Sequence, residues 1–378
     1  MKILHLSDTS LPDWRIEKSA LSSKRKDDSV YFGGPRNSSY NSIFDKVYDI
    51  SWTSRSRNRF PFHWKSVKKQ MLDTIIELRP DIIHAHNILS AKMVTEIGDY
   101  PLVYDDHEYW SMFAKIKLEA YFYYWSNKKG GFLNIKDWGK KFVLDLINKR
   151  LAKIWSKSEK DIVTNNPTIT VSKPIIDEFI KFSNRIYLVP NFPGTTEIEN
   201  IPEPAYHDTL SSVYAGNQMK SPIKPKHMDL EGFFNLFERN NIGKLFVLGW
   251  NGISTSNIIF RGYLNRIQMY IEMQKNSIGL IPFKKHWFHP FSSPNKAYEY
   301  AHAGLLVMNT SDLISITANL REHCIQFENY EDLTRKLYNL SNDLDELYSK
   351  RLNVYRFARN NLLWEKFEKN IFESYKAC

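Results

Sequence analysis

Residues 278–309 constrain the fold more than any other stretch of the chain. The stretch opens with an apolar run at 278–283 and closes with another at 305–308, and each run is typical of a buried strand in a parallel sheet. Between the two runs, Pro294 suits the start of a helix and Gly304 suits its end. The sequence therefore predicts a strand, a loop, a helix and a second strand. This order places the helix N-terminus at the carboxyl end of the first strand, the edge where open α/β sheets bind ligands.

The start of this predicted helix has the chemistry of a phosphate-binding site. Ser293 is a preferred capping residue, and the amides of a helix N-terminus attract anions. Lys296 adds a positive charge in the first turn, and Glu299 lies on the same helix face as Lys296 and Asn295. These features suit a sugar nucleotide, whose diphosphate would meet the helix end and whose ribose hydroxyls would meet the carboxylate. The alternative interpretation is an ordinary capped helix with a surface lysine and glutamate.

The same stretch resembles the donor-binding motif of family 4-like glycosyltransferases of the GT-B fold class. The residues that match the motif are Pro294, Asn295, Lys296, Glu299, Tyr300, Ala303, Gly304 and Val307. Many members of this family carry a further glutamate, which would fall at Phe291 and usually faces the transferred sugar. Its absence leaves the identity of the sugar open. The resemblance implies an α/β fold of two Rossmann-like domains facing a cleft, with a C-terminal helix that crosses back to the first domain.

Short apolar runs that alternate with helical patterns organise the first half of the chain. The runs predicted to be strands cover residues 2–6, 30–32, 46–52, 81–86, 102–104, 168–171 and 186–189. Helices are predicted at 15–25 and 64–78. Alternating strands and helices are typical of a parallel, doubly wound sheet. The run at 46–52 is polar enough to be an edge strand.

The second half continues this pattern after a linker at 197–204, which contains three acids and two prolines. Strands are predicted at 212–215, 245–248 and 258–260, ahead of the two described above. The tail at 355–375 has apolar residues at helical spacing and predicts one long helix. The expected domains are an N-terminal Rossmann-like domain over 1–192, a nucleotide-sugar-binding domain over 205–354, and a crossover helix over 355–378.

Polar residues crowd the carboxyl end of the strand at 102–104, where α/β folds place their chemistry. They are Asp105, Asp106, His107 and Glu108. The resemblance implies that His107 is the histidine that relatives place beside the transferred sugar, and a hydrogen-bonded loop histidine is the alternative. Asp13, Arg15 and Glu108 are expected on the acceptor side. A solvated helix charge is the alternative for Arg15.

The resemblance also assigns residues around the donor. Gly216 and Asn217 follow the strand at 212–215, but most relatives carry an arginine at the position of Asn217. Lys220 is one of several nearby lysines that would supply positive charge to the diphosphate. Relatives hold the base near the turn at Gly262 through main-chain groups. The expected donor site is completed by Ser293, Asn295, Lys296 and Glu299.

No metal or other cofactor is expected, because the nucleotide sugar is itself a substrate. His84 and His86 alternate on one strand face, but the sequence shows no third ligand at metal spacing, which favours histidines packed in a core or loop. Asp105 and Asp106 form an adjacent acidic pair, yet GT-B enzymes generally do not bind metal through such a pair.

Positive charge is concentrated in residues 111–160. The chain has 52 Lys and Arg against 42 Asp and Glu, a net charge of +10. This segment has eleven Lys and one Arg against four acids, which is +8, and it also holds ten aromatic residues. Such a mixture suits an anionic membrane surface, and core packing with solvated lysines is the alternative. No nucleic-acid-binding module is recognisable, so nucleic acid is not an expected partner.

The sequence predicts a cytoplasmic protein, with attachment to the inner face of the membrane through this segment as a further expectation. Asp8 interrupts the first apolar run, so no signal peptide is expected. No run of about eighteen apolar residues predicts a membrane span. Cys324 and Cys378 lack the spacing of a disulfide framework or metal site, which fits a reducing compartment.

The predicted function is transfer of a hexose from a nucleotide-diphosphate sugar to a glycan or lipid-linked acceptor. Similarity to family 4 implies retention of configuration, with the leaving diphosphate taking the acceptor proton while Lys296 and the helix end stabilise the developing charge. One alternative is an inverting GT-B transferase with Asp105, Asp106 or Glu108 as general base. The others are a nucleotide-sugar 2-epimerase and a non-catalytic nucleotide-sugar-binding protein.

Overall fold

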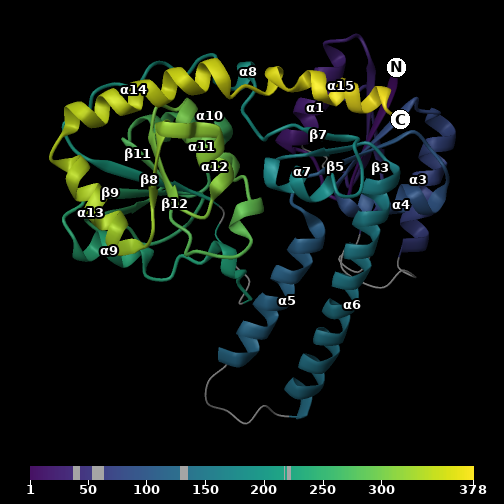
Figure 1. Cartoon of the computed structure of the whole chain (residues 1–378), viewed down its shortest axis with the longest axis horizontal. Helices are drawn as coiled ribbons and strands as arrows, with labels where there is room; N and C mark the ends of the chain where they lie inside the picture. The colour runs from purple at the N-terminus through teal and green to yellow at the C-terminus, as the bar shows by residue number, and fades with distance from the viewer. Residues whose placement is uncertain (37–42, 53–63, 128–134, 217, 219–222) are drawn as a thin grey trace. The chain divides into compact units, whose positions relative to one another are not determined.

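The computed structural model divides the chain into two compact units (Figure 1). It describes all residues except 37–42, 53–63, 128–134, 217 and 219–222. Unit 1 comprises Met1–Pro190 and Phe367–Cys378, and unit 2 comprises Asn191–Lys366. The chain therefore passes from unit 1 to unit 2 after Pro190 and returns after Lys366, whereas the sequence placed the corresponding boundaries near 192 and 355.

Unit 1 is built on a seven-stranded parallel sheet in the order β3-β2-β1-β4-β5-β6-β7. Its strands are β1 (Lys2–Ser7), β2 (Ser29–Gly34), β3 (Lys46–Asp49), β4 (Ile82–His86), β5 (Leu102–Asp106), β6 (Thr168–Thr170) and β7 (Ile186–Leu188). Its helices are α1 (Trp14–Lys24), α3 (Lys65–Leu78), α4 (Asn87–Ile97), α5 (Trp110–Asn127), α6 (Ile135–Asn165), α7 (Lys173–Phe179) and α15 (Glu368–Lys376). The predicted edge position of β3 is confirmed.

Unit 2 is built on a six-stranded parallel sheet in the order β10-β9-β8-β11-β12-β13. Its strands are β8 (Ser211–Ala215), β9 (Lys244–Leu248), β10 (Ile258–Phe260), β11 (Ile278–Ile281), β12 (Leu306–Thr310) and β13 (Cys324–Phe327). Its helices are α8 (Thr195–Ile198), η2 (Lys226–Met228), α9 (Phe233–Arg239), α10 (Arg266–Gln274), η3 (His289–Phe291), α11 (Asn295–His302), α12 (Ile314–Leu320), η4 (Arg321–His323), α13 (Tyr330–Ser341), α14 (Leu344–Asn361) and η5 (Trp364–Lys366). Two parallel sheets with helical connections confirm the predicted class, α/β with two Rossmann-like units.

The strand–helix–strand unit predicted at 278–309 is present as β11, α11 and β12. Helix α11 lies directly on β11, since a Cβ added to Gly279 would stand 2.3 Å from the ring of Tyr300. The hydroxyl of Tyr300 in turn accepts a hydrogen bond from the backbone of Ala215 at 2.7 Å. Gly279 and Tyr300 therefore allow the helix to approach the sheet closely at the edge where its first turn begins.

The basic and aromatic segment forms two helices. Helices α5 and α6 pack side by side and extend away from the sheet of unit 1 (Figure 1). Five consecutive aromatic residues at 121–125 hide the helical period of α5, so its pattern is not visible in the sequence. Within the described residues, no helix has the length and apolar character needed to cross a bilayer.

The single long helix predicted at 355–375 is wrong. Helix α14 ends at Asn361 and α15 begins at Glu368. Between them Trp364 is buried, and its backbone N–H donates to the carbonyl of Pro193 at 3.0 Å. The burial of this indole and its backbone hydrogen bond interrupt the helix, although apolar residues continue at helical spacing through the segment. Unit 2 ends shortly afterwards, at Lys366.

Candidate functional site

Lys296, in the first turn of α11, lies at the carboxyl edge of the unit 2 sheet. Its ammonium group sits over two aromatic rings, 4.4 Å from the centroid of Tyr214 and 5.2 Å from that of Phe283. A Cβ added to Gly216 would stand 3.0 Å from Lys296 Nζ. Burial lowers the pKa of Lys296 to about 8, although Glu299 acts in the opposite direction. The structure thus brings together Gly216 and Lys296, which the sequence assigned to the donor site separately.

Glu299 is buried one turn later and is paired with Arg266, the first residue of α10. Arg266 also contacts Glu197 of α8, through Nη2 at 2.6 Å and Nε at 3.1 Å. The predicted ribose acceptor is therefore part of an ion network with one arginine and two carboxylates. Arg266 was missed as a site residue, because no local pattern links residues that are distant along the chain.

The predicted N-cap of this helix is wrong by one residue. The N-cap is Pro294, and the helix begins at Asn295, whose side chain is exposed. The hydroxyl of Ser293 instead pairs with the hydroxyl of Tyr298 at 2.7 Å. The buried phenol of Tyr298, which also accepts from Asn319 Nδ2 at 2.8 Å, engages the serine that would otherwise cap the helix. No side chain of the described residues caps α11.

Gly262 forms a tight turn directly after β10. Its φ angle is +65°, a region that favours glycine. Its carbonyl accepts from the backbone of Gly249 at 2.7 Å, and its N–H donates to the carbonyl of Trp250 at 3.1 Å. The turn predicted at Gly262 is therefore present. Asn217 and Lys220, also predicted for the donor site, lie outside the described residues.

Asp105, at the end of β5, is the centre of a buried polar cluster in unit 1. Arg15 contacts it through Nη2 at 2.7 Å and through Nε at 3.0 Å from both carboxylate oxygens. Arg15 Nη1 also donates to the carbonyl of Val189 at 2.8 Å. Although burial raises the pKa of Asp105, the guanidinium holds it well below its usual value. Arg15 is itself buried, so its alternative interpretation as a solvated helix charge is wrong.

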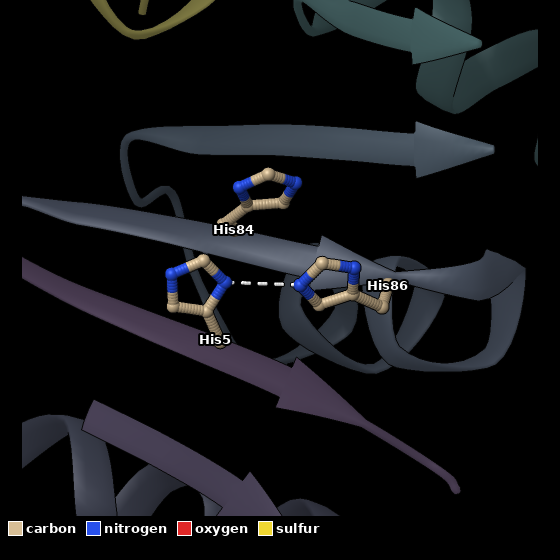
Figure 2. Close-up of side chains that lie close together, drawn as sticks. All are labelled: His5, His84 and His86. Atoms are coloured by element: carbon tan, nitrogen blue, oxygen red, sulfur yellow. Dashed lines mark hydrogen bonds between the residues drawn. The ribbon is translucent and has the colours of Figure 1, made fainter. Parts of the chain in front are cut away.

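Three histidines surround Oδ2 of this carboxylate. Asp105 Oδ2 lies 3.4 Å from His84 Nε2, 3.3 Å from His86 Nδ1 and 3.3 Å from His107 Nε2. His86 Nδ1 lies 3.2 Å from His107 Nε2. The other ring nitrogen of His86, Nε2, lies 3.0 Å from His5 Nδ1. Figure 2 marks this contact with a dashed line. The cluster therefore joins side chains from β1, β4 and the end of β5.

The parallel register of the sheet explains why these side chains meet. His5 is paired with His84 across β1 and β4, and His86 is paired with Asp105 across β4 and β5. The sequence missed His5, because a single histidine in an apolar run carries no local signal. The pairing of strands that are far apart in sequence places it beside His86.

The histidines of this cluster differ in the direction of their pKa shifts. Burial lowers the pKa of His5 and of His86 well below the usual value, and it lowers the pKa of His84 as well. Burial also disfavours the charged form of His107, but the Asp105 carboxylate outweighs it and raises the pKa of His107. His107 therefore takes up a proton more readily than the other three histidines do.

Asp106 belongs to a separate buried group with Glu159 of α6. Its carboxylate accepts from the hydroxyl of Tyr104 at 3.0 Å and from the backbone of Tyr109 at 3.1 Å. Glu159 accepts from the backbone of Ser111 at 3.0 Å. Burial raises the pKa of Asp106 to about 6, and burial together with Asp106 raises the pKa of Glu159 to about 8. These contacts tie both helices of the α5–α6 pair to the end of β5.

The remaining predicted residues of unit 1 differ in exposure. Asp13 is the N-cap of α1, and its Oδ1 accepts from the backbone of Arg15 at 3.0 Å and of Ile16 at 3.2 Å. The side chain of Glu108 is exposed. Of the predicted acceptor-side residues, Arg15 and Asp13 are thus held by contacts within unit 1, whereas Glu108 is open to solvent.

Comparison with known proteins identifies the fold. No protein-family model matches the sequence, and no curated protein matches it either. Sucrose-phosphate synthase from Thermosynechococcus elongatus matches the structure with a TM-score of 0.67 and 10% identity, covering 100% of this chain and 98% of that one. HepE from Anabaena, solved in complex with UDP-glucose, matches with a TM-score of 0.66 and 13% identity over 100% of both chains. A glycosyltransferase from Rickettsia africae matches with a TM-score of 0.63 and 12% identity, covering 100% of this chain and 98% of that one. The likeness spans the whole chain, so the protein has the GT-B fold of two Rossmann-like units.

Proposed function

We propose that the protein is a glycosyltransferase that uses a nucleotide-diphosphate sugar as donor. The observation that carries this proposal is the arrangement in unit 2, where Lys296 lies beside Gly216 at the start of α11 and Glu299 follows one turn later. A cation, a helix N-terminus and a carboxylate in this order match the chemistry of a diphosphate joined to a ribose. The fold supports the same function, because HepE, which was solved in complex with UDP-glucose, has a similar fold.

In this proposal Lys296 and the first-turn amides of α11 bind the diphosphate. The ammonium of Lys296 is held against Tyr214 and Phe283 by cation–π contacts, which keep its charge close to Gly216. No carboxylate among the described residues forms an ion pair with it. Glu299 binds the ribose hydroxyls, and Arg266 fixes the orientation of its carboxylate. The turn at Gly262 holds the base through main-chain groups.

We assign the transfer step to a family 4-like retaining mechanism. The leaving diphosphate takes the acceptor proton, and Lys296 stabilises the negative charge that develops on it. His107 contacts the transferred hexose, and the Asp105 carboxylate, itself held by Arg15, orients the imidazole. Exposed Glu108 is the acceptor-side residue that is best placed to meet a glycan or lipid-linked acceptor.

A thermal-shift screen of the purified protein against UDP, GDP and ADP and their hexose derivatives tests this function. Ligand that binds only the native state raises the melting temperature with concentration. We expect one nucleotide series to stabilise the protein, and the anomeric configuration of the product, read by NMR, to be that of the donor. Donor turnover without acceptor would instead indicate an epimerase. A protein that no nucleotide sugar stabilises would contradict the proposal.

A second proposal is that helices α5 and α6 attach the protein to an anionic membrane surface. The apolar side chains of Phe122, Phe142 and Leu146 are 67%, 69% and 60% exposed. Along α6, Phe142, Leu146, Lys149 and Lys153 are all exposed and recur at spacings of three and four, so they share one helix face. Apolar residues followed by lysines on one face suit the boundary between lipid chains and anionic headgroups. A lipid-linked acceptor would be found at that surface.

A further inference from the structure

We infer that His86, Asp105 and His107 bind a divalent transition-metal cation, with Zn²⁺ as the best match. The sequence showed no third ligand near His84 and His86, because the third ligand comes from another strand. In the structure the three ligand atoms are His86 Nδ1, Asp105 Oδ2 and His107 Nε2, contributed by β4, β5 and the residue that follows β5.

The distances between these atoms match a face of a tetrahedral site. The three atoms form a nearly equilateral triangle, with sides of 3.2 Å (His86 to His107), 3.3 Å (His86 to Asp105) and 3.3 Å (His107 to Asp105). Zinc bonds to nitrogen and oxygen ligands are about 2.0–2.2 Å, so neighbouring ligand atoms of a tetrahedral site stand about 3.3–3.5 Å apart. The site needs little rearrangement to accept the ion.

Hydrogen bonding alone does not account for all three sides of the triangle. A carboxylate oxygen only accepts, and each imidazole nitrogen carries either one proton or one lone pair. At most two of the three contacts are therefore hydrogen bonds at any moment. One cation placed among the three atoms satisfies all three lone pairs together.

The surrounding contacts orient the ligands in the way that metal sites require. The free ring nitrogen of a ligating histidine normally donates to a polar partner, and that partner fixes the tautomer. His86 Nε2 lies 3.0 Å from His5 Nδ1 (Figure 2), so a proton on His86 Nε2 leaves the Nδ1 lone pair for the ion. Arg15 contacts both oxygens of Asp105, with Nη2 2.7 Å from Oδ1 and Nε 3.0 Å from Oδ2, and Oδ2 also faces the histidines.

Access and charge are also compatible with a cation. The side chain of His107 is 13% exposed and that of Asp105 is 1% exposed, so His107 is the ligand with some contact to solvent. Asp105 supplies the negative charge of the site and shares it with Arg15. Two imidazoles and one carboxylate are a usual ligand set for zinc and other first-row metals, with a remaining position for water.

The test is a metal titration of the full-length protein after treatment with a chelator and dialysis. We expect wild-type protein to bind one Zn²⁺ per chain, and Co²⁺ in its place to give the strong visible bands of a four-coordinate site. The His107→Gln variant should lose at least tenfold in Zn²⁺ affinity and lose the cobalt bands. Thermal melting without metal shows whether this variant is folded, and His86→Gln provides a second ligand variant.

Two control variants remove other groups that attract metal, the partly exposed His323 and the exposed thiol of Cys378. His323→Gln and Cys378→Ser should keep wild-type Zn²⁺ affinity and the cobalt spectrum. Equal Zn²⁺ affinity in wild type and the folded His107→Gln and His86→Gln variants would overturn the site. Wild-type protein that binds no stoichiometric Zn²⁺ would overturn it as well. Both are binding measurements, so their outcome is independent of glycosyltransferase activity.

Discussion

Arg266 and Glu299 form an ion pair within unit 2, and Arg266 reaches Glu197 at the same time. The carboxylate assigned to the ribose is therefore already bound to a cation before any donor arrives. The pair fixes the direction of the Glu299 side chain, which lowers the entropy that donor binding would otherwise cost. In the proposed donor site, Arg266 therefore acts as a positioning residue for Glu299.

The first prediction is that Glu299→Gln weakens donor binding and leaves the protein folded. The amide cannot form the charge-assisted hydrogen bonds that a carboxylate makes with ribose hydroxyls, a loss of about 1.5–3 kcal/mol, or roughly a 10- to 150-fold rise in Kd. Isothermal titration with the donor measures this change. Glu197→Gln is the matched control, because it removes the other partner of Arg266 and keeps Glu299. Equal affinities of the wild type and Glu299→Gln would rule out the ribose assignment.

The second prediction is that His107→Ala reduces turnover far more than nucleotide affinity. His107 belongs to unit 1, whereas the proposed nucleotide contacts belong to unit 2. Initial rates at saturating donor, together with the Kd of the nucleoside diphosphate, separate the two effects. A variant with weakened nucleotide binding and a normal rate per bound donor would show that this role is wrong.

The third prediction concerns the pH dependence of stability and Glu159. Its ordinary pKa is 4.5, and burial with the neighbouring Asp106 raises the folded-state pKa to about 8. Between these values the folded protein holds a proton that the unfolded chain has lost. The free energy of unfolding therefore falls as pH rises, by about 1.4 kcal/mol per pH unit from this group.

Glu159→Gln, which mimics the protonated acid, should remove this slope between pH 5 and pH 8, since its amide does not titrate. Denaturant unfolding of both proteins at several pH values measures it. The exposed Glu346→Gln is the control, and it should retain the wild-type slope. Parallel pH profiles for wild type and Glu159→Gln would contradict a neutral buried carboxyl at this position.

The fourth prediction is that the exposed face of α6 carries membrane binding. Phe142→Ser with Leu146→Ser should reduce sedimentation with anionic vesicles at all salt concentrations, because burial of apolar side chains is not screened. Lys149→Gln with Lys153→Gln should reduce binding mainly at low salt, by about 1 kcal/mol per lysine. Thermal melting and donor affinity serve as controls and should not change. If the wild-type protein does not bind anionic vesicles at low salt, the membrane proposal is wrong, and the alternative of packed helices with solvated lysines holds.

The strands that could be predicted from the sequence are those whose own residues form a recognisable apolar run. Strands β1, β4, β8 and β12 are short runs of apolar residues, because both faces of a parallel sheet are buried, and such runs are visible without any partner. Strand β13 was missed, since the sequence Cys324-Ile325-Gln326-Phe327 is only partly buried at the sheet edge and mixes polar with apolar residues.

Side-chain contacts within the sites were predictable only where they are local. Lys296 and Glu299 share a helix face, so their proximity follows from helical spacing. The partners of Glu299 and Asp105 come from segments that are far away in sequence, namely Arg266 for the former and Arg15 for the latter. These pairs depend on strand order and on helix placement against the sheet, which no local pattern encodes. His5 is a comparable case, because it reaches His86 only through the pairing of β1 with β4.

The central claim is that a nucleotide-diphosphate sugar binds at Lys296, and calorimetry on one variant tests it most directly. Lys296→Met removes the charge and keeps an unbranched side chain against Tyr214 and Phe283, so the fold should persist. The exposed Lys275→Met is the matched control. With the nucleotide sugar that stabilises the wild type most, we predict at least a tenfold loss of affinity for Lys296→Met and none for Lys275→Met. Equal donor affinity in the wild type and in folded Lys296→Met would contradict the account.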